Sequence, residues 1–352
     1  MKTGAYLREN GVRGEMGDLR CGLLCGLAAV FVLAVAVGVA AFWYCLGVPG
    51  RPHRGPLPPA TAEEIDLAQR LKRHVTAIAS APHNVRYYAE LQAAAAYIER
   101  TLGAIGYRVM PQRFEVDGRE VRNIEVVIEP SAASPDTPSL VIGAHYDSAG
   151  DVPGANDNGT GAAAVIELAR LLEGAALKTR IRLVLFVNEE PPYFKTPDMG
   201  SLRYAQRLAE RKERVVGMMS LETMGYFSDA PGSQNYPWPF GLAFGDTGDF
   251  IAFVGTLGAR SFMRQTIGSF RTHTAFPSIG GVAPAFVEGI DWSDHWAFAQ
   301  HGIPAIMVTD TAPFRYPHYH QLSDTPDKVD YERLARITKG IERTIRELSG
   351  GA

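Results

Sequence analysis

The feature that most constrains the fold of this chain is the alternation of short apolar runs with amphipathic stretches after residue 107. Apolar runs rich in β-branched residues, such as 139–143 and 181–187, are typical of buried strands. Between and after them, residues 161–172 and 200–210 have the spacing of helices. Strands that alternate with helices favour a sheet covered on both faces. The sequence therefore predicts a single α/β domain.

The other expected elements follow the same pattern. We expect strands at 107–116, 121–128, 215–221, 241–244 and 303–308, and helices at 88–102, 250–265 and 330–348. A capping box, Thr61-Ala-Glu-Glu64, predicts the start of a further helix that ends near residue 80. Residues 229–240 and 271–290 are rich in Gly, Pro and aromatic residues, so we expect surface loops of the kind that often shape a binding site.

An uncharged apolar segment occupies residues 21–48 and is long enough to cross about 30 Å of hydrocarbon as a helix. Lys and Arg in the tail 1–20 predict that this tail is cytoplasmic and that the rest of the chain crosses the membrane. The competing interpretation is a cleaved signal peptide, but the apolar run is about twice the usual length. We expect an uncleaved, single-pass signal anchor. The domain would face the periplasm from a bacterial inner membrane, or another extracytoplasmic space.

Residues 49–60 form a Pro-rich linker that we expect to be an extended, semi-rigid spacer between the anchor and a catalytic domain at 61–352. Such a spacer would hold the domain off the bilayer. The chain has three cysteines, Cys21, Cys25 and Cys45, all in or beside the apolar segment. The domain must therefore fold without disulfides.

The composition excludes one large class of function. Of the 352 residues, 46% are hydrophobic and 21% charged, which fits a globular body of roughly 300 residues with an appendage. The formal net charge is −3 and the Lys and Arg residues are scattered, so the chain has no basic field for a phosphate backbone. Nucleic acid is therefore not an expected partner.

Metal-binding side chains follow the expected strands. His145 comes just after the strand at 139–143, and ligands of open α/β sheets gather where strands end. The carboxylate of Asp147 could accept the second ring proton of His145, as is usual for a metal-bound imidazole. Glu189 and Glu190 end another strand, and adjacent carboxylates repel each other unless a cation or a proton separates them. Each pattern alone also fits a structural histidine or a solvated acidic turn.

Asp157 lies in the glycine-rich segment Gly154-Ala-Asn-Asp-Asn-Gly-Thr-Gly161, which leads into an expected helix. Such a loop could bind phosphate at the helix start. However, no Lys follows the final glycine, and the spacing matches neither a Walker nor a dinucleotide motif. A carboxylate on this loop is better placed to bridge two cations.

In their order and context, these motifs resemble the co-catalytic zinc exopeptidases. This family includes bacterial leucyl aminopeptidase, aminopeptidase Y and glutamate carboxypeptidase, with the glutaminyl cyclases as relatives. The resemblance covers about residues 64–348. The matching segments are Ala144-His-Tyr-Asp-Ser148, Gly154–Gly161, Asn188-Glu-Glu190 with Met199-Gly-Ser201, Leu221-Glu-Thr-Met-Gly225, Ser293-Asp-His295 with Gly302-Ile-Pro-Ala305, and Tyr319-His320 with Ser323-Asp-Thr-Pro326.

The resemblance implies a three-layer α/β/α sandwich with a mixed central sheet and two zinc ions per chain. It assigns the ligands as follows: Asp157 bridges both ions, Glu190 and His320 complete one site, and His145 and Glu222 complete the other. Glu189 would be the general base that takes a proton from the attacking water and returns it to the leaving amine. Asp147 would assist catalysis through His145. Cobalt or manganese could replace zinc at such ligands.

The chain departs from the family pattern at two positions. The ligand at Glu222 is often Asp in the family, and the extra methylene could shift the second ion. Residues 191–199 are longer than the usual Gly-rich loop and could narrow the pocket. Two other histidines compete as ligands: His318 is the main rival of His320, and His295 is a further candidate.

Several other residues have open roles. Asp294 and Asp324 could orient neighbouring groups, or each could cap a helix. The aromatic segment 235–240, together with Tyr316 and Tyr319, could line a hydrophobic specificity pocket, or could only pack the loop.

The sequence thus predicts a membrane-anchored aminopeptidase with two zinc ions, which removes N-terminal residues from peptides. Three alternatives stay open: a single-zinc glutaminyl cyclase, a carboxypeptidase or amidohydrolase on the same scaffold, and a non-catalytic, receptor-like ectodomain. The presence of both His145 and Glu222 favours the dinuclear hydrolase over the cyclase. The presence of every implied ligand and of the base Glu189 argues against a non-catalytic domain. No oligomeric state is predicted.

Overall fold

The structure is a computed structural model that describes the backbone of residues 6–351 and the side chains of residues 24–351. The charges of the predicted cytoplasmic tail, residues 1–20, lie outside the described side chains. The chain divides into two units, Met1–Gly47 and Val48–Ala352.

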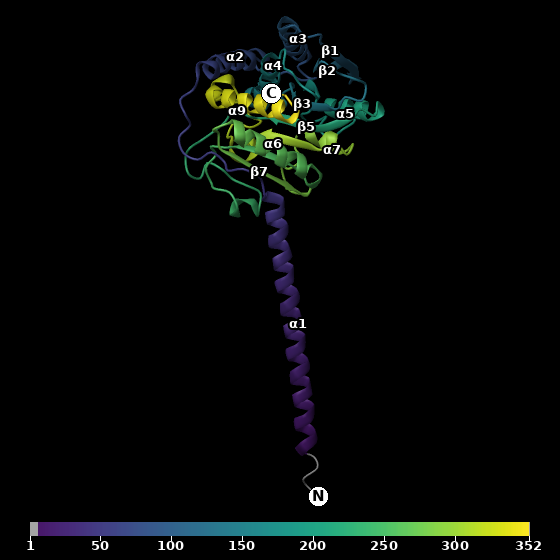
Figure 1. The fold of residues 1–352 in the computed structure, drawn as a ribbon, viewed down its shortest axis with the longest axis vertical. Helices are drawn as coiled ribbons and strands as arrows, with labels where there is room; N and C mark the ends of the chain where they lie inside the picture. Colours follow the sequence, from purple (N-terminus) through teal and green to yellow (C-terminus); the bar gives the residue numbers. More distant parts are fainter. Residues whose placement is uncertain (1–5, 352) are drawn as a thin grey trace. The chain divides into compact units, whose positions relative to one another are not determined.

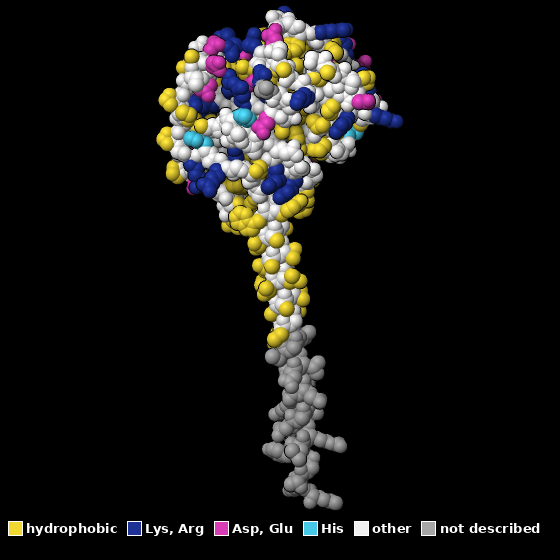
Figure 2. Space-filling view, in the orientation of Figure 1, with side chains coloured by type: hydrophobic (Ala, Val, Ile, Leu, Met, Phe, Trp, Pro, Cys, Tyr) yellow, Lys and Arg dark blue, Asp and Glu magenta, His cyan; other side chains and the backbone are white. Residues whose placement is uncertain are grey.

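Helix α1 (Tyr6–Leu46) forms the described part of the first unit. Its segment Leu24–Leu46 has a mean hydropathy of 2.7 and is long and apolar enough to cross a membrane. Figure 2 shows hydrophobic side chains along the described part of this helix. A signal sequence near an N-terminus has the same properties, so the helix fits either role.

Among the described residues, eight strands form one mixed sheet in the order β1-β2-β4-β3-β5-β8-β6-β7 (Figure 1). They are β1 (Met110–Val116), β2 (Arg119–Ile128), β3 (Ser139–His145), β4 (Arg180–Phe186), β5 (Val215–Glu222), β6 (Ile251–Thr256), β7 (Ser278–Ala283) and β8 (Ala305–Thr309). The central strands β4, β3, β5 and β8 are parallel, so their carboxyl ends meet at one edge. Strand β6 is antiparallel to β8 and parallel to β7. The amino ends of β6 and β7 therefore lie at that same edge.

Helices cover the sheet in two groups. Helices α3 (Tyr88–Ile105), α4 (Thr160–Leu171) and α6 (Arg260–His273) contact the strands. Helix α9 (Tyr331–Leu348) packs against α4 and α6, and α2 (Ala62–Ile78) packs against α4 and α9. Helices α5 (Gly200–Glu210) and α7 (His295–Ala299) form the second group, and α8 (Ala312–Arg315) is a short turn after β8. The expected three-layer α/β/α sandwich is confirmed. The predicted capping box is also present: Glu64 N donates to Thr61 Oγ1 at 3.2 Å, and Thr61 N donates to Glu64 Oε2 at 2.7 Å.

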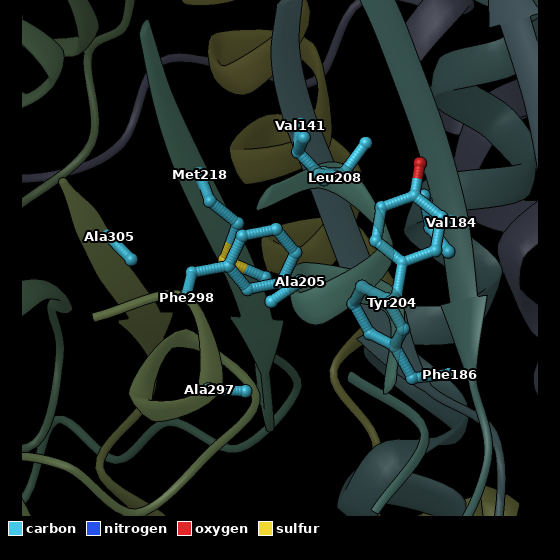
Figure 3. Close-up of a cluster of buried hydrophobic side chains, with 10 residues drawn as sticks. All are labelled: Val141, Val184, Phe186, Tyr204, Ala205, Leu208, Met218, Ala297, Phe298 and Ala305. Carbon is cyan, nitrogen blue, oxygen red and sulfur yellow. The ribbon is translucent and has the colours of Figure 1, made fainter. Parts of the chain in front are cut away.

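A buried apolar cluster fixes the central strands against α5 and α7 (Figure 3). The ring of Phe186 meets Tyr204 edge-on at 5.6 Å between centroids and Phe298 at 6.0 Å. Fully burying such a ring stabilises the fold by about 1.5–3 kcal/mol. Because Phe186 ends β4, this packing also fixes the strand end from which the acidic pair follows.

The helix predicted at 250–265 is wrong in its first half. Residues 251–256 form strand β6, and the helix α6 starts only at Arg260. Periodicity cannot distinguish a buried strand from a helix in so short an apolar run. The pairing of β6 with both β7 and β8 decides the outcome, and the sequence does not show that pairing.

Two expectations near the end of the sheet are also corrected. The predicted loop 271–290 contains strand β7, whose glycines are typical of loops and therefore favoured the wrong prediction. A Cβ on Gly280 would lie 2.8 Å from Ile267 Cδ1, so glycine lets α6 pack closely on β7. The predicted strand 241–244 is instead a 3₁₀ turn at Phe240–Leu242, preceded by Pro237 and Pro239, which cannot donate to a ladder.

The Pro-rich linker lies on the catalytic unit at both of its ends. Arg271 Nη1 of α6 donates to Pro49 O at 2.9 Å, and Arg336 Nη2 of α9 donates to Pro58 O at 2.7 Å. The sequence predicts an extended, semi-rigid spacer here. In the structure both of its ends are hydrogen-bonded to the catalytic unit.

Candidate metal centre

The side chains predicted to bind metal meet at the edge where the parallel strands end. His145 is the last residue of β3, Glu222 is the last of β5, and Glu189 follows the end of β4 by three residues. Asp157 lies in the irregular turn that precedes α4. The topology thus brings together residues that are far apart in the sequence.

The predicted ligands form two groups that share Asp157. His145, Asp157 and Glu222 form one group, and Asp157, Glu190 and His320 form the other; within each, the ligand atoms lie within 4.8 Å of one another. Asp157 Oδ1 is 3.3 Å from His145 Nε2, and Asp157 Oδ2 is 3.0 Å from His320 Nε2. One carboxylate oxygen therefore faces each imidazole, which is the arrangement of a bridging ligand.

Glu189 lies beside both groups. Its Oε2 is 3.8 Å from His145 Nε2, and it forms a third group with His145 and Glu190. The two groups that share Asp157 do not include Glu189.

The centre holds more negative charge than its own residues can balance. Burial raises the pKa of Glu190 to about 7, and the nearby Asp157 adds to this. Burial likewise raises the pKa of Glu222 to about 7, although His145 opposes it. Burial and the neighbouring glutamates raise the pKa of Glu189 well above its usual value, against the effect of His145. Buried carboxylates in such number call for cations.

Two orphaned atoms test whether metal ions fit this centre. Among the residues that the structure describes, His145 Nε2 and Glu190 Oε1 are buried and have no hydrogen-bond partner. Such atoms are rare in folded proteins and need a physical explanation. Imidazole nitrogen and carboxylate oxygen are also the donors that zinc takes. The residues therefore fit a pair of divalent ions that share Asp157.

Asp147 supports the centre through different atoms from those expected. His145 Nδ1 is 3.0 Å from the main-chain oxygen of Asp147, whereas the carboxylate Oδ1 is 3.7 Å away. The carboxylate instead accepts from Glu189 N at 3.1 Å and from Glu190 N at 3.2 Å. Asp147 thus orients the imidazole by its backbone and the acidic pair by its side chain.

Asp324 fastens the loop that carries the bridging carboxylate. It accepts from Asn156 N at 2.8 Å and from Asp157 N at 3.1 Å, and Tyr316 Oη donates to it at 2.7 Å. Of the two open roles, the structure therefore supports orientation of neighbouring groups over a helix cap.

Sequence reasoning missed two supporting residues inside the motifs. Asn158 accepts from Thr223 N at 3.1 Å and donates to Leu221 O at 2.8 Å, so it ties the bridging loop to the end of β5. Ser293 Oγ donates to Glu222 Oε2 at 2.7 Å. The only signal in the sequence was a small polar residue within a motif, which does not reveal its partner.

The rival candidates lie outside the groups. His318 Nδ1 is 2.8 Å from Ser323 Oγ, and His295 Nε2 is 2.9 Å from Ile290 O. Burial lowers the pKa of His295 to about 4. Asp294 makes no side-chain cap bond, and both its carboxylate oxygens are buried without a hydrogen-bond partner in the described part of the chain. Burial raises its pKa to about 7.

The aromatic residues separate into two places. Tyr319 stacks on His320 with 4.0 Å between ring centroids. Burial and the nearby carboxylates, above all Asp157, raise its pKa far above the usual value, so its hydroxyl stays protonated. Trp238, from the other predicted aromatic segment, is 86% exposed. The longer loop 191–199 is held by an ion pair of 2.8 Å between Lys195 and Asp291.

A family comparison agrees with this geometry. The profile of Peptidase family M28 matches residues 123–345, which is more than half of the chain. The chain belongs to this peptidase family. It is thereby a zinc-dependent exopeptidase, as the motifs predicted.

The proteins similar to this chain include an uncharacterized protein, an aminopeptidase and a glutaminyl cyclase. The chain is 40% identical over 260 residues to the uncharacterized protein YfbL of Escherichia coli, covering 71% of this chain and 78% of YfbL. It is 33% identical over 230 residues to aminopeptidase YwaD of Bacillus subtilis, covering 60% of this chain and 41% of YwaD. The chain therefore spans less than half of YwaD. The crystal structure of Fimbriiglobus ruber glutaminyl cyclase shares the fold, with a TM-score of 0.59, 20% identity and coverage of 85% of this chain and 98% of the cyclase.

Proposed function

We propose that this M28 peptidase is a membrane-anchored aminopeptidase that removes N-terminal residues from peptides with two zinc ions. The observation that carries the proposal is the pair of ligand groups that share Asp157, with Glu189 beside them and not needed by either. His145 and Glu222 would hold one ion, and Glu190 and His320 the other. Bound ions would polarise the scissile carbonyl and lower the pKa of a water.

Glu189 would then transfer the proton. Its carboxylate would accept a proton from the attacking water and give it to the leaving amine as the tetrahedral state collapses. Asp147 holds Glu189 in place by accepting from its main-chain N–H. The protonated hydroxyl of Tyr319, a half-buried residue whose ring stacks on His320, would donate to the developing oxyanion.

The charge of the site supports a substrate with a free amino terminus. Six buried carboxylates gather here: Asp147, Asp157, Glu189, Glu190, Glu222 and Asp294. Two divalent ions would leave a net negative charge, which attracts an α-ammonium group and repels an α-carboxylate. This balance favours an aminopeptidase over a carboxypeptidase on the same scaffold.

Peptide specificity tests the proposal. The full chain, loaded with zinc, would be assayed on matched peptides with a free or an acetylated N-terminus, and on a peptide that begins with glutamine. We expect hydrolysis of the free set alone, with two zinc ions per chain by elemental analysis. Equal cleavage of the acetylated set would contradict it, as would cyclisation of the glutamine peptide by a chain with one ion.

A variant pair tests the assigned base. Glu189→Gln should lower kcat by about 10²–10⁴-fold while the zinc content stays the same. Glu210→Gln, on the exposed side of α5, is the matched control and should change neither quantity. Unchanged hydrolysis in Glu189→Gln would show that another group is the base.

The apolar helix supports anchoring. We propose that Leu24–Leu46 stays in the mature protein as a single-pass anchor, with the catalytic unit outside the cytoplasm. The mass of the protein purified from its membrane fraction would show whether the N-terminus is intact. Protease treatment of intact spheroplasts should degrade the catalytic unit. A chain that lacks residues 1–46, or that is protected from protease, would contradict this topology.

A further inference from the structure

An uncharged aromatic loop stands out on the surface of the catalytic unit. The aromatic loop, defined here as residues 236–244, reads Tyr-Pro-Trp-Pro-Phe-Gly-Leu-Ala-Phe. Trp238 is 86% exposed and Leu242 is 81% exposed. Large apolar side chains that gather in the open mark a contact with another molecule or with a membrane. The proposed hydrolysis does not use them.

The start of the linker is fixed close to this loop. Arg271 donates to Pro49 O at 2.9 Å and to Gly50 O at 3.1 Å, and through its other nitrogens to Ser278 Oγ at 3.0 Å and Ser278 O at 2.7 Å. A Cβ on Gly268 would lie 2.9 Å from Pro49 Cγ, so the proline ring rests directly on α6. Pro49 is therefore held at the amino end of β7.

The aromatic loop is built on the same end of the sheet. Ser278 pairs with Ile251, the first residue of β6. The preceding residue, Phe250, stacks on Tyr236 with 6.3 Å between ring centroids and 7° between the planes. Tyr236 also contacts Phe244 at 5.6 Å, which closes the base of the loop. The start of the linker and the base of the aromatic loop therefore lie at the amino ends of the neighbouring strands β7 and β6.

Chain connectivity then limits the distance to the bilayer. Helix α1 ends at Leu46, and the backbone from Leu46 to Pro49 can reach roughly 10 Å when fully extended. If Leu24–Leu46 crosses the membrane, the surface around Pro49 must stay within that reach of the bilayer. A tether this short gives the aromatic loop a high effective concentration at the lipid surface.

We infer that the aromatic loop is a second membrane contact, with Trp238 and Leu242 inserted at the lipid interface. The inference rests on the proposed anchoring. Tryptophan favours the membrane–water interface, and a loop without charged residues has little to desolvate on entering it. A lipid surface is a better occupant than a soluble partner because the tether already holds it next to the loop.

Site-specific fluorescence tests the inference on the full chain. Because the catalytic unit has no cysteine, replacing Cys21, Cys25 and Cys45 by Ala lets one introduced thiol carry a polarity-sensitive dye. Trp238→Cys places the dye in the loop. Phe286→Cys is the matched control, since Phe286 is 88% exposed and follows β7 at the end opposite to Ser278. Thermal melts of both variants would check that they fold.

The labelled chains would be placed in vesicles of phosphatidylethanolamine and phosphatidylglycerol that contain a lipid with a spin label on its acyl chain. We expect at least about twofold stronger quenching at position 238 than at 286, as for a side chain 5–10 Å into the interface. Equal quenching in a chain that floats with the vesicles after an alkaline wash would overturn the loop contact and leave the anchor standing. A chain that does not float would overturn the anchor, and the loop contact with it.

Discussion

Two buried carboxylates near helix α4 differ in how their charge is balanced. Glu167, in the middle of the helix, is bound by Arg70 Nε at 2.6 Å and by His74 Nε2 at 2.9 Å. Among the described ion pairs, the partners of Asp157, just before the helix, are two imidazoles, and those are shared with three further glutamates. The guanidinium of Arg70 balances Glu167 from within the protein, whereas four carboxylates around Asp157 share two imidazoles. A buried charge that lacks a partner inside the protein indicates a ligand from outside it.

The largest expected effect comes from removing the shared carboxylate. Asp157→Asn should lower kcat/KM by about 10³-fold or more, because both ions lose a charged ligand and several kcal/mol of transition-state stabilisation. Elemental analysis should find fewer ions per chain. Glu167→Gln is the comparison: it should lower the melting temperature but leave the zinc content and kcat/KM unchanged. A fully active Asp157→Asn with two ions would remove the distinction between the two carboxylates.

Removing zinc with a chelator should lower the melting temperature most in proteins that keep Asp157. An ion present at 100–1,000 times its Kd stabilises the fold by about 3–4 kcal/mol. At roughly 2–4 °C per kcal/mol, removing zinc should lower Tm by about 6–16 °C. Calorimetry should give the same decrease in Glu167→Gln and a smaller one in Asp157→Asn, which binds fewer ions. A similar decrease in all three proteins would mean that the chelator acts elsewhere.

A smaller effect is expected where a neutral side chain positions a ligand. Ser293→Ala removes the hydrogen bond to Glu222 and should weaken the ion held by His145 and Glu222 by about 10-fold, with the other ion retained. Zinc titration against a competing chelator would measure both affinities. Ser323→Ala is the control, because Ser323 contacts His318 outside the centre. Equal weakening of both ions in Ser293→Ala would contradict a local role for Ser293.

The elements that the sequence predicts correctly have a signal within their own residues. The elements that it misses depend on contacts with distant residues. Strand β3 is a short apolar run and helix α5 has clear periodicity, and motifs adjoin both elements, so both matched the prediction closely. Strand β7 contains Gly280, which lets side chains of α6 pack closely on the strand. The sequence of the strand shows the glycine, but it does not show the helix side chains that pack against it.

The same limit applied inside the centre. The ligand types followed from motif order, but Ser293 and Glu222 are 71 residues apart, and their hydrogen bond depends on how the loop before α7 approaches the end of β5. For Asp147, the residue was predicted and the atom was not. Whether its carbonyl or its carboxylate faces His145 is set by backbone angles at the end of β3.

The smallest expected effect is the response of the Glu167 network to acid. Burial alone would raise the pKa of Glu167, but hydrogen bonds from His74 and Arg70 hold it below its usual value. A depressed pKa contributes stability above the unfolded value of 4.5, and this contribution is lost as pH falls through the folded value. The Tm gap between the wild type and Glu167→Gln should therefore narrow as pH falls from 6 to below 4.5. Both proteins should be chelated, so that the metal centre titrates equally in each and cancels from the difference. A gap that stays constant over this range would show that Glu167 is not ionised in the folded chain, and that its network is no better balanced than the centre at the start of the same helix.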